Sequence, residues 1–177
     1  MALGTKLSKE DSNLFDQPTL YRSIVRGVQY LTHSRPDLSF AMNRLSQFLQ
    51  YSTIAHWIAC KRVLRYIKGI SKHGLIFRKN QNFLLEGYAN ADWASDIGDR
   101  RSTSGYRIFL GGNLVQWCSG KQRAVALSST EAEYRALRAL SSNLAFHART
   151  KYIEIDDHYV RELAAERKLC VQYVASE

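Results

Sequence analysis

The chain has 177 residues, 45% of them hydrophobic and 23% charged, which is enough for one ordinary domain or a small domain with a helical extension. Its net charge of +9 indicates a polyanionic partner, most often nucleic acid, although a basic surface without a partner is the simpler alternative. Its apolar runs are too short to cross a membrane, and the N-terminus lacks a signal-peptide layout. The three cysteines, Cys60, Cys118 and Cys170, match neither a disulfide framework nor a zinc site. We therefore expect an intracellular protein, in either cytoplasm or nucleus.

The first 72 residues predict a lead-in followed by three helices. Residues 1–17 are polar and unpatterned, so we expect them to be flexible. A helix should begin at Pro18, with one apolar stripe formed by Leu20, Ile24, Val28 and Leu31. A second should begin at a capping-box pattern in residues 34–37, and its apolar residues are Leu38, Ala41, Met42, Leu45, Phe48 and Leu49.

The third predicted helix begins at Thr53 and ends at Gly69, with Trp57, Cys60, Leu64 and Ile67 turned inward. Its other face carries a basic stripe made of Lys61, Arg65 and Lys68, with Arg62 beside it. Such a stripe is either a solvated helix face or a surface that follows a phosphate backbone. The residue pattern favours neither interpretation over the other.

Short apolar runs after residue 72 predict an antiparallel sheet. Residues 75–77 and 83–88 suggest a hairpin across a polar turn, and an Asp-rich loop spans residues 92–99. Residues 105–110 and 114–118 form a second hairpin across Gly111 and Gly112, because glycine accepts positive φ. A further strand is expected at residues 124–127. Ser128 then caps a helix over about residues 130–141, with Glu131 at the capping-box position.

The remaining residues predict a helical pattern around residues 153–163 and a final strand at residues 169–174. No strand is predicted between this helix and the one that begins near Thr130.

Five segments, in this order, resemble the C-terminal part of the Pol polyprotein of copia-type LTR retrotransposons. They are YRSIVRGVQYLTHSRPDLSFAMNRLSQF, AHWIACKRVLRYIKG, GYANADWASDIGDRRSTSGY, ALSSTEAEYRAL and HARTKYIEIDDHYVRE, and together they cover most of the chain after about Asp16. The resemblance implies a helical segment from the reverse-transcriptase thumb and connection at 18–72. It also implies a partial ribonuclease H-like domain at 73–177, with an α/β (α+β) fold.

The family activity implied is cleavage of the RNA strand in RNA–DNA hybrids, within a larger Pol polyprotein. Two Mg²⁺ ions about 4 Å apart assist such an in-line attack, and they need several carboxylates because Mg²⁺ prefers hard oxygen ligands. The family supplies four acids. The first belongs at Asn90, a neutral and poorer ligand, and Asp92 is a possible weak substitute two residues further along. The helix acid corresponds to Glu133, whereas Glu131 fits the N-terminal cap.

The other two acids of the family have no counterpart in this sequence. The third lies in a Cys-Asp-Asn-like segment, but here Asn143 is followed almost directly by the motif that begins at His147. A strand and its helix, about 30 residues judged by a βαβ unit, are therefore expected to be deleted. The fourth lies just beyond a stretch like residues 171–175, and the chain ends at Glu177. We expect an incomplete site that holds Mg²⁺ poorly and lacks activity.

Several polar residues are candidates for nucleic-acid contacts. Residues 100–104 form a donor-rich turn, residues 121–122 lie near the hybrid in the family, and the basic stripe of the third helix adds cations. The complete set is Lys61, Arg65, Lys68, Arg100, Arg101, Ser102, Thr103, Ser104, Lys121 and Gln122.

Three hypotheses remain open from the sequence. The chain is an active ribonuclease H, a relic that binds nucleic acid without cutting it, or a decayed reading frame whose product does not fold stably. The third arises because loss of a strand beside the first one exposes a sheet edge.

Overall fold

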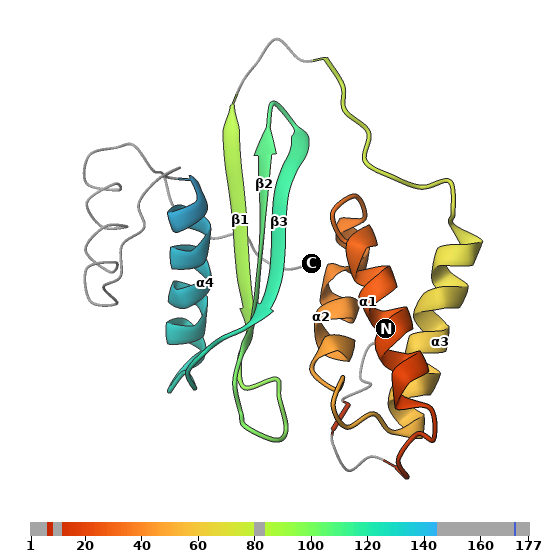
Figure 1. Cartoon of the computed structure of the whole chain (residues 1–177). Coiled ribbons are helices and arrows are strands. Elements are labelled where there is room, and N and C mark those ends of the chain that lie inside the picture. The colour runs from red at the N-terminus through yellow and green to blue at the C-terminus, as the bar shows by residue number, and fades with distance from the viewer. Residues whose placement is uncertain (1–6, 9–11, 80–83, 145–171, 173–177) are drawn as a thin grey trace.

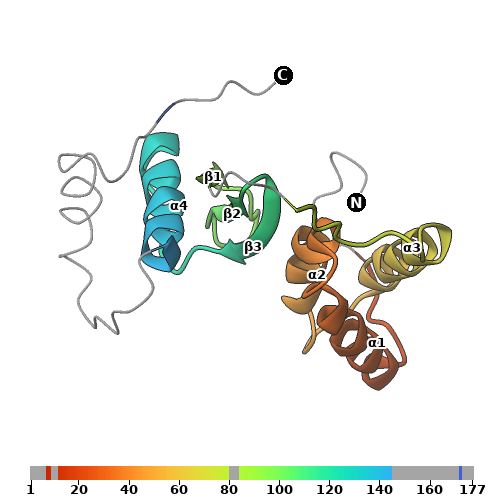
Figure 2. The ribbon, with the colours of Figure 1, turned by 90° about the horizontal axis from the view of Figure 1, so that it is seen from above.

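The computed structural model describes residues 7–8, 12–79, 84–144 and 172. A three-stranded sheet lies between the helix α4 on one side and the helices α1, α2 and α3 on the other (Figures 1 and 2). Within these residues no helix is long and apolar enough to cross a bilayer. The predicted helix at 153–163 lies outside the described residues, as does the predicted strand at 169–174 apart from Gln172.

The N-terminal part contains three α-helices and one short 3₁₀ helix. They are α1 (Pro18–Leu31), η1 (Pro36–Leu38), α2 (Ser39–Ser46) and α3 (Ile54–Gly69). The three α-helices were predicted, with Pro18 opening α1 and Gly69 ending α3. Their shared core is one cluster of buried side chains, which are Leu7, Tyr21, Val25, Leu38, Ala41, Met42, Leu45, Phe48, Ala59, Cys60 and Val63.

The buried stripe of α1 differs from the predicted one. Tyr21 and Val25 are fully buried, whereas Leu20 and Leu31 are exposed. The Tyr21 hydroxyl donates a hydrogen bond of 2.9 Å to the Leu45 carbonyl, which turns this face of α1 toward α2. Burial also raises the pKa of Tyr21. A buried phenol needs such a partner, so the tyrosine rather than the leucines decides the rotation of the helix.

The predicted capping box at the start of the second helix is wrong. The Ser34 hydroxyl donates to the Leu31 carbonyl at the end of α1, and no side chain caps η1 or α2. Asp37 instead accepts two hydrogen bonds from Arg35, of 2.9 and 2.7 Å. This charge-assisted pair takes the carboxylate away from the helix N-terminus.

The start of α3 is built from Thr53 and His56. The Thr53 hydroxyl accepts from the His56 N–H, and the His56 ring accepts from the Thr53 N–H at 3.0 Å. His56 and Val63 are buried, whereas the predicted inward residues Trp57 and Leu64 are only partly buried. Part of the predicted lead-in packs here as well, because Phe15 stacks on Trp57 with ring centroids 4.8 Å apart.

The sheet contains β1 (Leu85–Asp92), β2 (Thr103–Leu110) and β3 (Asn113–Lys121), antiparallel and in the order β1-β2-β3. The predicted turn between β2 and β3 is confirmed, with φ of 55° at Gly111 and 77° at Gly112. These positive values favour glycine in a tight hairpin turn.

Two predicted strands are absent from the described sheet. Residues 75–77 form no strand, and the Asn113 side chain bonds both the N–H and the carbonyl of the nearby Arg78. Residues 124–127 form none either, because side chains take their backbone groups. Trp93 donates to the Ala126 carbonyl at 3.0 Å, and Arg135 donates to the Ala124 carbonyl at 2.9 Å.

The helix α4 (Ser129–Leu144) covers one face of β1 and β2. Its buried residue Leu140 joins Tyr106 and Ile108 in a second, smaller core. A Cβ on Gly87 would lie 2.9 Å from Leu140, so β1 and α4 meet where β1 lacks a side chain. Ala89 packs against the same core, which shows that Gly87 and Ala89 point toward α4.

Candidate metal and nucleic-acid site

Asn90 occupies the position predicted for the first acid, in the middle of a regular strand. It pairs with Gly105 on β2 and is exposed. Its side-chain oxygen accepts a hydrogen bond of 2.8 Å from the N–H of Ala91. Because Gly87 and Ala89 point toward α4, alternation along β1 directs Asn90 to the opposite face.

Asp92 is the last residue of β1 and pairs with Thr103. The pairing of β1 with β2 is regular to this end, and the register shift of the sheet lies between Ile108 and Phe109, against β3. Asp92 therefore points to the same face as Asn90 but lies about 6–7 Å further along the strand. No bulge in β1 brings its carboxylate to the Asn90 position.

Glu133 lies near the start of α4 and is exposed. The neighbouring Glu131 performs the capping role that the sequence predicts. Its N–H donates to the Ser128 hydroxyl at 3.1 Å, while its carboxylate accepts from the Leu127 N–H and from Arg135. In a standard capping box the Glu131 carboxylate would accept from the N–H of Ser128, whereas here it accepts from the N–H of Leu127, one residue earlier.

These residues do not fit a pair of Mg²⁺ ions. Asn90 contributes a neutral oxygen that already accepts a hydrogen bond. Asp92 lies on the face of β1 that points away from α4, whereas Glu133 belongs to α4, which covers the other face of the strand. In the part of the chain that the structure describes, no three His, Cys, Asp or Glu side chains form a group that could hold a metal ion. Two closely spaced dications require more carboxylates than this.

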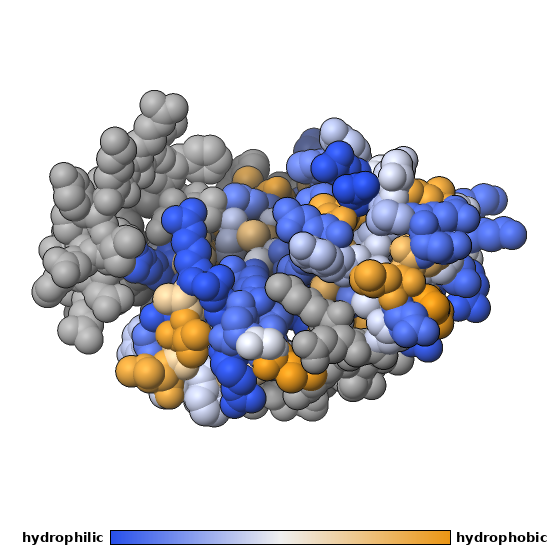
Figure 3. Space-filling model, turned by 60° about the horizontal axis from the view of Figure 1, so that its bottom comes forward, coloured by the Kyte–Doolittle hydropathy of each residue, from blue (hydrophilic) through white to orange (hydrophobic). Residues whose placement is uncertain are grey.

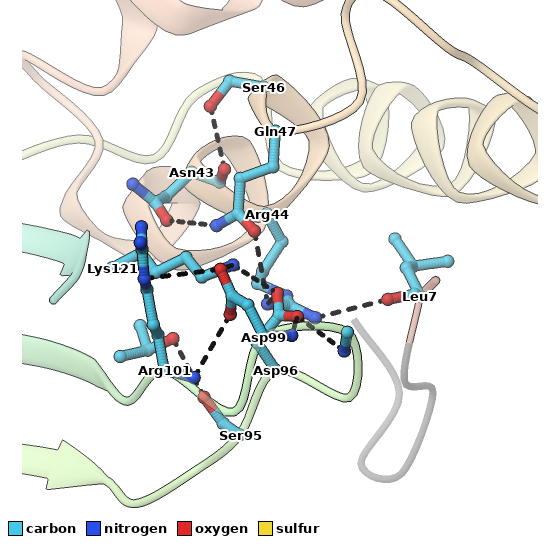
Figure 4. A network of polar contacts seen from close by, with 12 residues as sticks. Leu7, Asn43, Arg44, Ser46, Gln47, Ser95, Asp96, Asp99, Arg101 and Lys121 are labelled. Atoms are coloured by element: carbon cyan, nitrogen blue, oxygen red, sulfur yellow. Dashed lines mark hydrogen bonds and ion pairs between the residues drawn. The ribbon is translucent and has the colours of Figure 1, made fainter. Parts of the chain in front are cut away.

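An ion-pair network connects the loop after β1 to β3 and to α2 (Figure 4). The Lys121 ammonium lies 2.8 Å from both Asp96 and Asp99, and Arg44 lies 3.2 Å from Asp96. Burial alone would raise the pKa of Asp96, but hydrogen bonds from Lys121 and from the N–H groups of Asp99 and Gly98 outweigh it and lower this pKa to about 2. Lys121, predicted to contact nucleic acid, is held within this network.

Most of the predicted turn at 100–104 is also occupied internally. Ser102 is fully buried and its hydroxyl accepts from the Ala94 N–H, while the buried Thr103 hydroxyl bonds Ser95. The amide of Gln122 donates to the Ser104 hydroxyl and to the Ala132 carbonyl, at 2.7 and 2.9 Å. Arg100 is exposed and Arg101 partly exposed. The Arg101 guanidinium also lies 3.5 Å from the Asp99 carboxylate, so among the described residues of the loop Arg100 is the guanidinium left to meet a phosphate.

The basic stripe of α3 is exposed along its whole length. Lys61, Arg65 and Lys68 all lie on the solvent side, and Lys61 also sits 5.8 Å from the centre of the Trp57 ring. Residues 18–72 contain nine Lys and Arg but a single acid, Asp37, so this segment accounts for +8 of the net charge of +9. On the face shown in Figure 3, polar side chains surround separate groups of apolar ones.

Two open clefts lie between the helices and β3. The larger, about 640 Å³, is lined by residues of α1, α3, the segment after α3 and β3, including His33, His73 and Trp117. The smaller, about 370 Å³, lies between α2 and β3. Trp117 of β3 connects the sheet to the end of α1, because its ring N–H donates a hydrogen bond of 2.8 Å to the Thr32 carbonyl. These clefts could not be predicted from the sequence, because the residues that line them are far apart along the chain.

No family model matches the chain, and no solved structure matches it. The retrovirus-related Pol polyproteins from transposons RE2 and RE1 of Arabidopsis thaliana are each 38% identical over 210 residues, which is 99% of this chain and 14% of the polyprotein. An uncharacterized mitochondrial protein of the same plant is 41% identical over 137 residues, 77% of this chain and 57% of its own length.

The alignment lengths reveal an internal gap. The alignment with RE2 is 210 positions long, but it contains only 99% of the 177 residues of this chain. About 35 positions of the relative therefore have no counterpart in this chain. The 137-position alignment uses 77% of the chain and thus contains almost no such gap. A stretch that covers 77% of the chain always includes the middle of the chain, wherever it starts. Because this stretch is almost free of gaps, the missing segment lies toward one end of the chain. The predicted gap between Asn143 and His147 agrees with this.

Both RE2 and RE1 belong to one class, the retrovirus-related Pol polyproteins. The present chain belongs to the Pol polyproteins of copia-type transposons, and it corresponds to a region with an internal segment missing. It spans 14% of the length of these two relatives.

Proposed function

We propose that residues 73–177 form a ribonuclease H-type domain that no longer cleaves RNA in RNA–DNA hybrids. Residues 18–72 are then the end of the reverse transcriptase, and the whole chain binds nucleic acid without hydrolysing it. The two separate buried cores, one within residues 7–63 and one within residues 89–140, support this division.

The state of Asn90 carries the proposal of inactivity. An aspartate at this position would offer two anionic oxygens to a metal, whereas the Asn90 amide offers one neutral oxygen, and that oxygen accepts the Ala91 N–H. Glu133 is exposed on α4, and the length of the alignment with RE2 agrees with a missing segment of about the size of a strand and its helix. One helix carboxylate cannot replace the charge that two Mg²⁺ ions require.

The charge distribution supports retained binding. Residues 18–72 contain many more cations than acids, and the stripe of Lys61, Arg65 and Lys68 is exposed on one side of α3. Arg100 and Arg101 add two further cations on the loop after β1. A cationic surface of this kind binds polyanions mainly by releasing counterions, without reading sequence.

A salt titration tests the binding. The chain is added to a fluorescently labelled RNA–DNA hybrid in EDTA, and anisotropy is followed at several salt concentrations. The proposal expects an affinity that falls steeply as salt rises, with a linear relation between the logarithms of both quantities. An affinity independent of salt contradicts it. A thermal melt of the same sample must show a cooperative transition, because a chain without one would support the alternative of a decayed, unfolded product.

A further inference from the structure

The outer edge of β1 is a row of hydrogen-bonding groups that no other strand of the described residues pairs with. β1 stands at the end of the sheet order, with β2 on its inner side only. The Gly111 N–H donates to the Leu84 carbonyl at 2.8 Å, which makes this a hydrogen-bonded pair. Because such pairs alternate along an antiparallel ladder, the backbone groups of Leu85, Gly87, Ala89 and Ala91 point away from β2.

The hydrogen bond of the Ala91 N–H confirms that this group points away from β2. The Ala91 N–H is bonded by the side chain of Asn90, as expected of a group that no strand reaches. Within the described part of the chain, no hydrogen bond is found for the outward groups of Leu85, Gly87 and Ala89. Asn90 therefore marks one end of a free edge that extends back to Leu85.

The edge lacks the features that normally prevent strand pairing. β1 has no proline, lysine or arginine, and its pairing with β2 is free of bulges. Its charged residues are Glu86 and Asp92. Large apolar side chains beside the edge are exposed, with Leu85 52% and Tyr88 48% accessible. An edge that is long, regular and flanked by apolar side chains is a site for strand addition.

We infer that this edge pairs antiparallel with β1 of a second copy of the chain, about a two-fold axis. One register satisfies two constraints. It leaves the Ala91–Asn90 bond intact, and it avoids placing Glu86 opposite an acid of the other copy. In this register Gly87 faces Gly87, the outward groups of Leu85 meet those of Ala89, and each Glu86 lies opposite Tyr88.

A second copy suits this edge for reasons of charge and symmetry. A two-fold interface is self-complementary, so the outward N–H groups of Leu85, Gly87 and Ala89 in one copy meet carbonyl groups of the other. The register sets the carboxylate of Glu86 beside a neutral ring instead of a like charge, which would destabilise a directly opposed pair. The inference does not depend on the proposed function, because none of these contacts involves nucleic acid or a metal.

The test is sedimentation analysis of the whole chain across a range of concentrations, with two variants of one residue. Tyr88→Glu sets a carboxylate opposite Glu86 and should weaken the dimer about fivefold or more. Tyr88→Lys sets an ammonium opposite Glu86 and should leave the dimer at least as tight. The matched control is Tyr134→Glu, because Tyr134 is also an exposed tyrosine and lies on α4, and its dimer should be unchanged.

Each result decides the inference. A monomer at every concentration overturns it, as does an association that Tyr88→Glu leaves unchanged or that Tyr134→Glu weakens equally. Circular dichroism confirms that each variant folds. Should Tyr88→Glu not fold, Leu85→Pro takes its place, because it removes an outward N–H at the first residue of β1 without touching the ladder to β2. A dimer that survives Leu85→Pro at full strength also overturns the inference.

Discussion

Arg44 of α2 and Asp96 of the loop after β1 lie 3.2 Å apart, and this ion pair joins the helical part of the chain to the sheet. Both side chains are mostly buried, and Arg44 also donates to the Leu7 carbonyl. The contact is visible at the centre of Figure 4. A buried pair of this kind stabilises little by itself, but its disruption leaves an uncompensated charge.

Replacement of Arg44 by alanine should therefore destabilise the chain by about 3 kcal/mol, because Asp96 then keeps its burial and loses one of its two cations. The measurement is the free energy of unfolding from urea titration. Arg62→Ala, at an exposed position of α3, is the control and should stay within about 0.5 kcal/mol of the parent chain. Equal effects of the two variants would contradict the role of the pair.

The stability of the chain should depend on acid pH through Asp96. Its pKa is about 2 when folded against 3.8 for the ordinary carboxyl, so its stabilisation is complete above about pH 4 and is lost as the pH falls toward 2. Asp96→Asn should cost about 2 kcal/mol at pH 7, and the difference from the parent chain should shrink below pH 4. Asp16→Asn, at an exposed position, is the control. A difference that does not change with pH would refute this assignment.

A methyl group at Gly87 should disturb the packing of α4 on the sheet. The Cβ of Gly87→Ala would lie 2.9 Å from Leu140, and we expect a loss of about 1–3 kcal/mol. Gly27→Ala is the matched control, because its Cβ meets nothing within 4 Å on a helix, where alanine stabilises by up to about 1 kcal/mol. Thermal or urea unfolding of the two variants should give shifts of opposite sign. Shifts of the same sign would show that the α4 contact is not as tight as described.

Neutralising the basic stripe of α3 should weaken binding to the hybrid. With Lys61, Arg65 and Lys68 all changed to Gln, the slope of log affinity against log salt should fall by about 3, close to one per lost phosphate contact. The control changes three exposed cations outside the proposed surface, which are Arg78, Lys79 and Arg123. If the control lowers the slope as much as the stripe variant, binding follows net charge alone.

The sequence predicted the ends of several elements because local chemistry sets them. Pro18 opens α1, Gly69 ends α3, and the glycine pair at 111–112 makes the turn. It did not predict the buried face of α1, since Tyr21 and Val25 have the same helical spacing as the leucines. The hydrogen bond from Tyr21 to Leu45, 24 residues away, decides between the two stripes.

Long-range contacts also explain the misassigned strand and the occupied site residues. The short apolar run at residues 124–127 looks like a strand, yet the Ala126 carbonyl accepts a hydrogen bond from Trp93, 33 residues earlier. Lys121 looks available for phosphate, but the network around Asp96 holds it, and Arg44 enters that network from 52 residues away. The sequence shows that Asn90 stands where the family has an acid, but only the structure shows that its side chain accepts a hydrogen bond from Ala91.

The most direct measurement of the central claim is cleavage of a labelled RNA–DNA hybrid in Mg²⁺, analysed on a denaturing gel. The parent chain and Glu133→Gln should both leave the RNA intact, and Asn90→Asp should do so as well, because one restored acid still leaves too few ligands for two ions. RNA fragments that require Mg²⁺ and disappear in Glu133→Gln would contradict the account and show that the chain completes a working site.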